Sequence, residues 1–190
     1  MTTTVTGLFD SYDTARRAVS DLEAAGIPDS DISIISANAA VDEGAEPTTG
    51  TETGAAVGAV LGGGAGLLAG LGMLAIPGLG PVVAAGWLAS TAVGAVAGGA
   101  AGGIVGSLTD AGVSERTANV YAEGIRRGGT LLSAKVDDSQ AGIARSIIAS
   151  NNPVDPEARD AAYRNTGWTR FDETALPDEK TEPPRDRSLH

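Results

Sequence analysis

The first 37 residues predict a strand, a helix and a second strand from the order of their apolar and polar positions. Residues 3–9 are rich in β-branched and other apolar side chains, which is typical of a strand. Asp10 or Ser11 is placed to cap the helix that follows, in which apolar residues recur at helical spacing. Because residues 31–37 predict the second strand, we expect residues 1–37 to form a first βαβ half.

Residues 113–154 predict one helix followed by a second βαβ half. Ser114 is placed to cap that helix, which covers about 114–127. The alternating stretch 130–136 predicts a strand, and a helix and a short fourth strand near Asn152–Val154 follow it. The residues expected to face inward are Val113, Thr117, Val120, Tyr121 and Ile125 in the first helix, and Ile143, Ile147 and Ile148 in the second.

The C-terminal residues predict one more helix and a tail. Asp155, Pro156 and Glu157 are typical of a helix start, because a capping side chain precedes a proline in the first turn. This helix and a Gly-Trp-x-x-Phe element make up residues 155–171, and the polar residues 172–190 predict a disordered tail. If the long stretch between the two halves is set aside, their order is that of a ferredoxin-like α+β fold.

The stretch between the halves is rich in glycine and lacks charge. A polar linker at 38–53 leads into it, and residues 53–109 carry no charged residue. Of the 27 glycines, 17 lie between Gly54 and Gly106. We predict that residues 54–108 form a helical hairpin, with arms over Gly54–Ile76 and Val82–Leu108 and a turn at Pro77–Pro81.

Small residues recur every four positions along both predicted arms. This spacing places them on one helix face, where two backbones can approach closely and gain dispersion contacts. A glycine in an exposed helix costs about 1 kcal/mol relative to alanine, so such arms need a packing partner. The predicted helix-packing positions are Gly54, Gly58, Gly62, Gly66 and Gly70 in the first arm, and Gly86, Ser90, Gly94, Gly98, Gly102 and Gly106 in the second.

Two environments suit such a hairpin. At about 1.5 Å per residue the arms would span roughly 35 and 40 Å, and the hydrocarbon core of a bilayer is about 30 Å thick. The nearest basic residues, Arg116, Arg126 and Arg127, weakly favour the cytoplasmic side for both ends. The arms are mostly alanine and glycine, which leaves open a soluble hairpin that packs on its own domain or in a homo-oligomer.

Composition excludes several classes of function. The net charge is −11 and no basic stripe is present, which argues against nucleic-acid binding. The chain has no cysteine and a single histidine, His190 at the C-terminus, which argues against thiol chemistry, histidine metal sites and a Ser-His-Asp triad. The N-terminus shows no secretory signal, so we expect a cytoplasmic origin. We therefore expect no enzyme activity, cofactor, metal site or small-molecule substrate.

Two groups of residues are candidates for partner binding. The carboxylates cluster at predicted helix starts, turns and the linker, where capping is the preferred interpretation. Tyr121, Arg126 and Arg127 form either a patch for a partner or, as we prefer, a helix face with a buried tyrosine and solvated arginines. Trp168 and Phe171 follow the last predicted helix, and they either dock back on the domain as a clasp or bind a partner.

Several segments resemble a bacterial family of general stress proteins, the YflT-type or low-temperature-induced proteins. They include Val5-Thr-Gly-Leu-Phe-Asp10, the turn Ala75-Ile-Pro-Gly-Leu-Gly-Pro81, and Tyr121-Ala-Glu-Gly-Ile-Arg-Arg-Gly-Gly-Thr-Leu-Leu-Ser133, within a resemblance that covers roughly residues 3–150. The stretch 162–171 is similar to an element often attached to such proteins. The resemblance implies a role in the general stress response and supplies no catalytic residue.

Three hypotheses about function follow. The first is a non-enzymatic stress-response protein that is attached to the cytoplasmic side of the cell membrane by its glycine-zipper hairpin. The second is a soluble homo-oligomeric scaffold protein that self-assembles through the zipper. The third and weakest is a small-ligand sensor that uses the ferredoxin-like domain.

Overall fold

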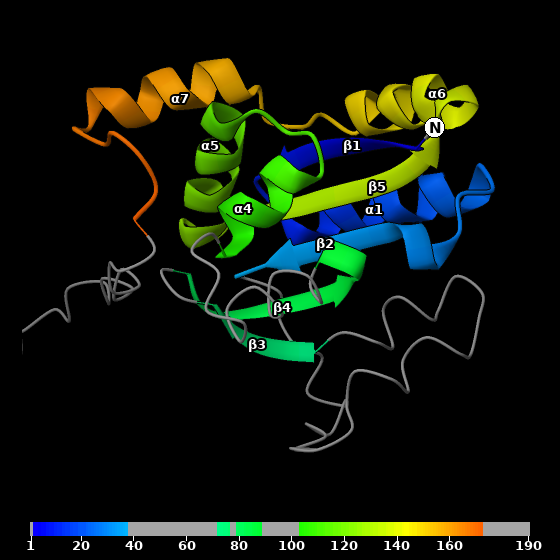
Figure 1. Cartoon of the computed structure of the whole chain (residues 1–190), viewed down its shortest axis with the longest axis horizontal. Helices are drawn as coiled ribbons and strands as arrows, with labels where there is room; N and C mark the ends of the chain where they lie inside the picture. The colour runs from blue at the N-terminus through cyan, green and yellow to red at the C-terminus, as the bar shows by residue number, and fades with distance from the viewer. Residues whose placement is uncertain (1, 38–71, 77–78, 89–102, 173–190) are drawn as a thin grey trace, which may run out of the picture.

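The computed structural model describes residues 2–37, 72–76, 79–88 and 103–172, and it confirms a mixed α+β fold. Five strands form one antiparallel sheet in the order β1-β5-β2-β4-β3 (Figure 1). The strands are β1 (Thr2–Phe9), β2 (Ile32–Ser36), β3 (Gly72–Ile76), β4 (Gly80–Gly86) and β5 (Thr130–Asp137). The helices are α1 (Tyr12–Ala24), the 3₁₀ turn η1 (Asp29–Asp31), α4 (Gly103–Asp110), α5 (Glu115–Arg126), α6 (Asp138–Ser150) and α7 (Pro156–Asn165).

Side chains at the N-termini fix where three of the predicted helices begin. The Ser11 hydroxyl accepts a hydrogen bond from the Thr14 backbone N–H at the start of α1, and Ser114 does the same at the start of α5. The Asp155 carboxylate accepts from the N–H groups of the first turn of α7. Each bond satisfies a donor that the helix itself leaves unpaired. Asp137 occupies the N-cap position of α6, but its side chain makes no capping hydrogen bond.

The sheet has a hydrophobic cluster on each face. One cluster joins α1 and α6 to the strands through residues such as Leu22, Leu132 and Ile148. The other joins α4 and α5 to the opposite face through residues such as Leu8 and Ile125. Figure 1 shows α4 and α5 in front of the sheet and α1 behind it. Strand residues therefore alternate between two buried faces, and a one-residue shift of register would move each side chain into the wrong cluster.

The helical prediction is wrong for residues 72–76 and 82–86, and residues 80–81, predicted as part of the turn, are the first two residues of a strand. These residues form strands β3 and β4, which pair with each other, and β4 also pairs with β2 from Ser33↔Gly86 to Ser36↔Val83. The β-branched side chains of Val82 and Val83 suit a pleated strand, and both are buried. Pairing with β2 satisfies backbone groups that a helix would have satisfied locally. Among the described residues of the hairpin, Trp87, Leu88 and the end of the second predicted arm, from Gly103 onward, are helical.

Neither of the two predicted zipper positions that the structure describes lies at a close contact between two helices of the chain. Gly86 lies in strand β4 with φ +89°, where an added Cβ would overlap the Ile32 carbonyl oxygen. Gly106 lies in helix α4, but an added Cβ there would meet no atom within 4 Å. The other nine positions lie outside the described residues, as do the linker 38–53 and the tail from residue 173. Gly86 is thus a close-approach glycine between strands rather than between helices.

Two smaller predictions are also wrong. Residues 152–154 form no strand, although the Val154 N–H donates a hydrogen bond to the Leu8 carbonyl at 2.7 Å. Ile143 was expected to face inward from α6, but it is 53% exposed. The small residues Ala141 and Ala144 are buried in its place, because they let α6 lie close to the sheet. Among the helices that the structure describes, none has the length and apolar character to cross a membrane.

Candidate functional site

The predicted partner patch on α5 is folded into the protein. Tyr121 is 5% exposed and belongs to the cluster on the α4–α5 face, where burial raises the pKa of its hydroxyl. The guanidinium groups of Arg126 and Arg127 both turn to Glu123 on the same helix. These three residues therefore do not form one open surface. The buried tyrosine agrees with the preferred sequence interpretation, and so does Arg127, whose side chain is 37% exposed, whereas the Arg126 side chain is only 14% exposed.

Glu123 is a buried carboxylate held by two arginines. Its side chain is 1% exposed, and Arg126 donates to its two oxygens at 2.9 and 2.7 Å. Arg127 donates to one of those oxygens at 2.6 Å. Forked guanidinium groups match a carboxylate well, and such charge-assisted bonds offset the cost of removing the carboxylate from water.

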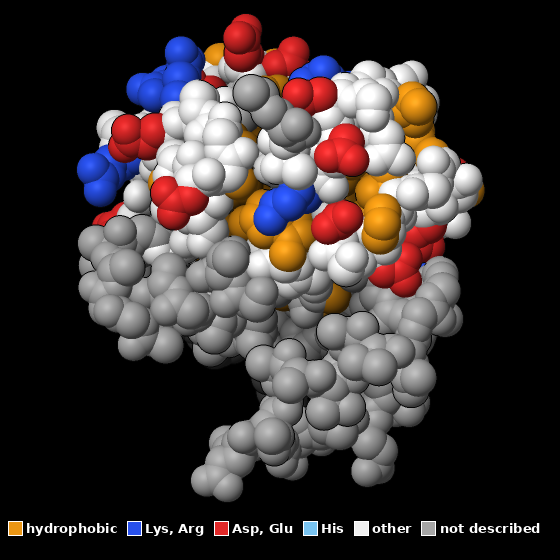
Figure 2. All heavy atoms as spheres, turned by 45° about the vertical axis from the view of Figure 1, so that its right-hand side comes forward, with side chains coloured by type: hydrophobic (Ala, Val, Ile, Leu, Met, Phe, Trp, Pro, Cys, Tyr) orange, Lys and Arg blue, Asp and Glu red, His pale blue; other side chains and the backbone are white. Residues whose placement is uncertain are grey.

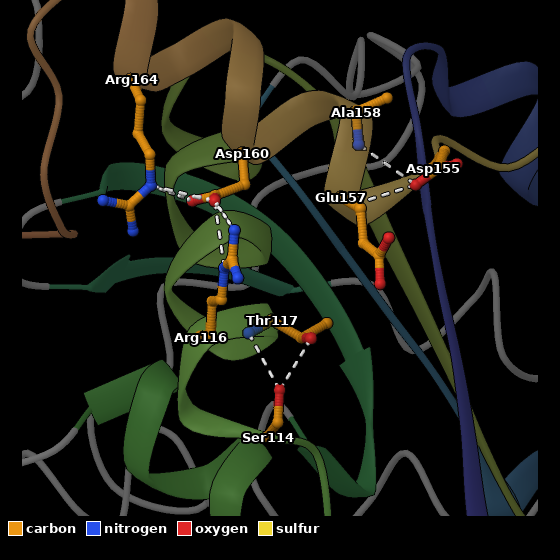
Figure 3. A network of polar contacts seen from close by, with 8 residues as sticks. All are labelled: Ser114, Arg116, Thr117, Asp155, Glu157, Ala158, Asp160 and Arg164. Atoms are coloured by element: carbon orange, nitrogen blue, oxygen red, sulfur yellow. Dashed lines mark hydrogen bonds and ion pairs between the residues drawn. The ribbon is translucent and has the colours of Figure 1, made fainter.

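A second buried carboxylate, Asp160, joins α5 to α7 (Figure 3). Its side chain is 2% exposed and accepts hydrogen bonds from Arg164 on its own helix and from Arg116 on α5. The hydrogen bonds from Arg164 and then Arg116 lower the pKa of this carboxyl. Because Arg116 is the partner on the other helix, this contact fixes the position of α7.

Tyr163 lies at the centre of the same interface. The Arg127 guanidinium lies over its ring at 4.4 Å from the centroid, and the Trp168 ring meets it edge-to-face at 5.5 Å. Arg159 on α7 forms an ion pair with Asp10 at 2.7 Å and approaches the Tyr163 ring from its own helix. Burial raises the pKa of the Tyr163 hydroxyl. Arg127 therefore links the buried Glu123 to the aromatic pair on the C-terminal segment.

The Gly-Trp-x-x-Phe element continues this contact. Phe171 is 3% exposed and belongs to the same cluster as Leu8 and Ile125. Its backbone N–H donates to the Asn119 side-chain oxygen at 3.1 Å. Trp168 packs on Tyr163, as described above. The element takes the docked arrangement of the two that the sequence left open, and we call residues 155–171 the clasp.

Glu123, Asp160 and Tyr163 are site residues that the sequence pattern did not predict. The signal for both carboxylates was present, because each has an arginine three or four residues later in its helix, at Arg126, Arg127 and Arg164. What the spacing could not show was burial. An i,i+4 pair is usually a solvated surface contact of small energy.

The described residues contain no group of three or more metal-ligating side chains. A surface cavity of about 300 Å³ near the start of α1 is lined by Asp10, Ser11, Thr14, Arg17, Ser150, Asn151 and Asn152. On the face shown in Figure 2, acidic side chains are scattered and basic ones gather mainly at the upper left. The contacts of Glu123, Asp160 and Tyr163 are suited to holding residues 155–171 against the domain.

Acid is expected to weaken the clasp through Asp160. Because the folded-state pKa of Asp160 is lowered, its contribution to docking is present above the ordinary value of 3.8 and is lost as pH falls below it through the folded value. We expect Trp168 fluorescence, measured in a Trp87→Phe background, to report release in that range. Asp160→Asn in the same background is the matched control. An identical acid transition in both proteins would contradict the assignment to Asp160.

The clasp, which contains Asp160, forms together with the buried Glu123 on α5 the most elaborate polar arrangement in the described part of the chain. Contacts with α5 and with Asp10, just before α1, tie residues 155–171 to the body of the domain. Comparisons with models of known families, with curated proteins and with solved structures found no match to this chain.

Proposed function

We propose that this protein is a non-enzymatic stress-response protein that associates with the cytoplasmic side of the cell membrane through its charge-free residues 53–109. The observation that carries the proposal is the contrast in charge. The chain has a net charge of −11, yet residues 53–109 carry none of its charged side chains. Charge-free stretches rich in alanine, glycine and leucine are tolerated in a bilayer at little cost, whereas a single aspartate there costs about 2.5–3.5 kcal/mol.

The α+β domain supports a role as a platform for this segment. Strand β4 pairs with β2 in the sheet, and α4 packs on α5. Residues 53–109 are therefore joined to the domain through both β4 and α4. Within the platform, β5 lies between β1 and β2, which α1 connects. That order supports our further proposal of a ferredoxin-like relationship, in which residues 54–108 are an insertion. The resemblance to the YflT-type family supports the stress-response role.

A second candidate is a soluble homo-oligomeric scaffold that self-assembles through residues 53–109. It is favoured by a specific observation, namely that the described parts of this segment pack against protein. Val82 and Leu88 are buried in the cluster on the α4–α5 face, and so are Ile104 and Leu108. In this alternative the remaining glycine positions supply contacts between copies.

Cell fractionation is expected to place the full chain in the membrane pellet and to keep it there after an alkaline carbonate wash. Val96→Asp should move most of the protein to the soluble fraction, because it puts a charge into the apolar segment. Val96→Ile is the matched control. Protein that is wholly soluble as wild type would overturn the membrane proposal.

The scaffold alternative makes a different prediction for the same fractions. Gly62→Leu or Gly98→Leu should disrupt assembly by steric exclusion at a close helix contact, while leaving the segment apolar. Sizing of the soluble fraction by light scattering measures the effect. A soluble wild-type monomer, or an assembly unchanged in both variants, would exclude the scaffold role of these glycines.

A further inference from the structure

Within the part of the chain that the structure describes, most of the outer edge of strand β1 is open. It lies at one end of the sheet, with β5 on its inner side (Figure 1). Among the described residues, the outer edge receives a single backbone hydrogen bond, from the Val154 N–H to the Leu8 carbonyl. Because alternate residues of a strand direct their backbone groups to the same side, Thr2, Thr4 and Thr6 also present their N–H and C=O groups outward.

As far as the described residues go, this edge lacks the features that usually prevent strands from pairing with other chains. Natural edge strands carry charges, prolines or bulges, or are covered by other elements. The eight residues of β1 (Thr2–Phe9) include no charged residue and no proline. They pair with β5 without interruption from Thr2↔Asp137 to Phe9↔Thr130, so the strand contains no bulge. The described chain approaches the edge only near Leu8 and leaves the threonine end open.

The outward positions are self-complementary. If two copies meet antiparallel with Thr4 at the twofold axis, Thr4 pairs with Thr4 of the second copy, and Thr2 pairs with Thr6 of the second copy. In that register each outward N–H meets a carbonyl, which is the closely spaced pairing of an antiparallel ladder. The symmetry follows from isologous pairing, in which both copies use the same surface. Although the chain is acidic, β1 itself carries no charged residue, so pairing of two β1 strands brings no like charges of these strands together.

Helix α6 adds complementary charges to the same edge. The Thr3 hydroxyl donates to the Asp138 carboxylate at 2.7 Å, which places Asp138 on the β1-edge side of the helix. Arg145 is exposed and stands two turns later, on the same face. Between them Gly142 leaves open space, because a Cβ there would meet no atom within 4 Å. An antiparallel second copy brings its Asp138 toward Arg145 and its Arg145 toward Asp138.

We propose that this protein forms a symmetric dimer by pairing the β1 edges of two copies, with the α6 helices crossing above the axis. The pairing joins the two sheets into one. The partner is a second copy of this chain, because the edge is self-complementary in both its hydrogen bonds and its charges. This interface uses neither the clasp nor residues 53–109, and it is independent of the proposed function.

Substitution at the axis tests the backbone pairing. Thr4→Pro removes the outward N–H at the centre of the interface in both copies, and the proline ring obstructs the approach. We expect the dimer dissociation constant, measured by analytical ultracentrifugation, to rise more than about tenfold. Thr4→Val keeps the N–H and strand propensity, and should leave the constant within about threefold. Circular dichroism melting shows whether each variant is folded.

Charge reversal tests the helix contact without altering the strand. Arg145→Glu places two like-charged pairs across the axis and should weaken the dimer about tenfold. The double variant Asp138→Lys with Arg145→Glu restores opposite charges and should recover most of the loss. If Arg145→Glu weakened the dimer only by disturbing the fold, the added Asp138→Lys substitution would not restore the dissociation constant.

Three outcomes would overturn the proposal. One is a wild-type protein that stays monomeric at a concentration of about 100 μM. Another is a dimer that is unchanged by Thr4→Pro and Arg145→Glu in folded protein. The third is an assembly lost in Gly98→Leu but kept in Thr4→Pro, which would place self-association in residues 53–109. The dimer proposal can be tested separately from the membrane proposal. Val96→Asp, which tests membrane association, changes no residue of β1 or α6.

Discussion

Replacing Gly86 by alanine is expected to destabilise the folded protein by about 3 kcal/mol. Gly86 has φ +89°, a conformation that side-chain-bearing residues rarely adopt. An added Cβ would also overlap the backbone of Ile32 and Ser33 on the neighbouring strand. Backbone atoms of a paired strand cannot rotate away as a side chain can. Relief therefore requires β4 to separate from β2.

Gly106→Ala is the matched control for this prediction, because Gly106 has the same place in the four-residue glycine spacing. It lies in α4, and a Cβ there meets nothing within 4 Å. Alanine should stabilise the protein by about 0.5–1 kcal/mol, since glycine is the poorer helix former. Urea unfolding followed by circular dichroism measures both changes. Equal changes in unfolding free energy for Gly86→Ala and Gly106→Ala would contradict the crowded backbone at Gly86 and the open space at Gly106.

Glu123→Ala should cost about 3 kcal/mol of unfolding free energy. The substitution removes the carboxylate that both Arg126 and Arg127 approach, and the Arg126 side chain is only 14% exposed. A buried guanidinium without its carboxylate is a larger penalty than the loss of a surface ion pair. Arg127 would also lose the contact that orients it over Tyr163, so the clasp should loosen together with the core.

Glu123→Gln measures how much of the loss in unfolding free energy is due to the charge of Glu123 rather than to the volume of its side chain. The amide keeps the volume and one oxygen acceptor, and we expect it to cost about half as much as alanine. Unfolding in urea gives the stabilities, and the emission of Trp168 in a Trp87→Phe background reports the clasp. A cost below about 1 kcal/mol for Glu123→Ala would mean that the arginines find water or other partners instead.

Local signals in the sequence were enough to predict most of the domain. Ser11, Ser114 and Asp155 cap helices as expected, because capping depends on one side chain and the next turn of backbone. The alternation in residues 130–136 likewise predicted β5, with Leu132, Ala134 and Val136 in one cluster. These elements are specified by their own residues, whatever they later pack against.

Residues 72–86 could not be assigned in the same way. Glycine and alanine at spacing four fit a helix, but they carry no side chain that excludes a strand. What decided the outcome was the free edge of β2, to which β4 adds through pairs such as Ile34↔Ala85. That contact joins residues about fifty positions apart, as the Ser33 to Ala85 hydrogen bond shows. Burial of Glu123 and Asp160 also depended on the docking of α7, which no local pattern indicates.

The position of β5 between β1 and β2 has a consequence for how the protein is made. Neither N-terminal strand can join the sheet's centre until residues 130–137 have left the ribosome. Ser36 and its hydrogen-bond partner Thr130 are separated by 94 residues, which take roughly 5–20 s to synthesise. The charge-free residues 53–109 emerge during this interval, before the strand that completes the sheet. The nascent chain is therefore at its most aggregation-prone while the ribosome still holds it, and that is when we expect chaperones to bind it.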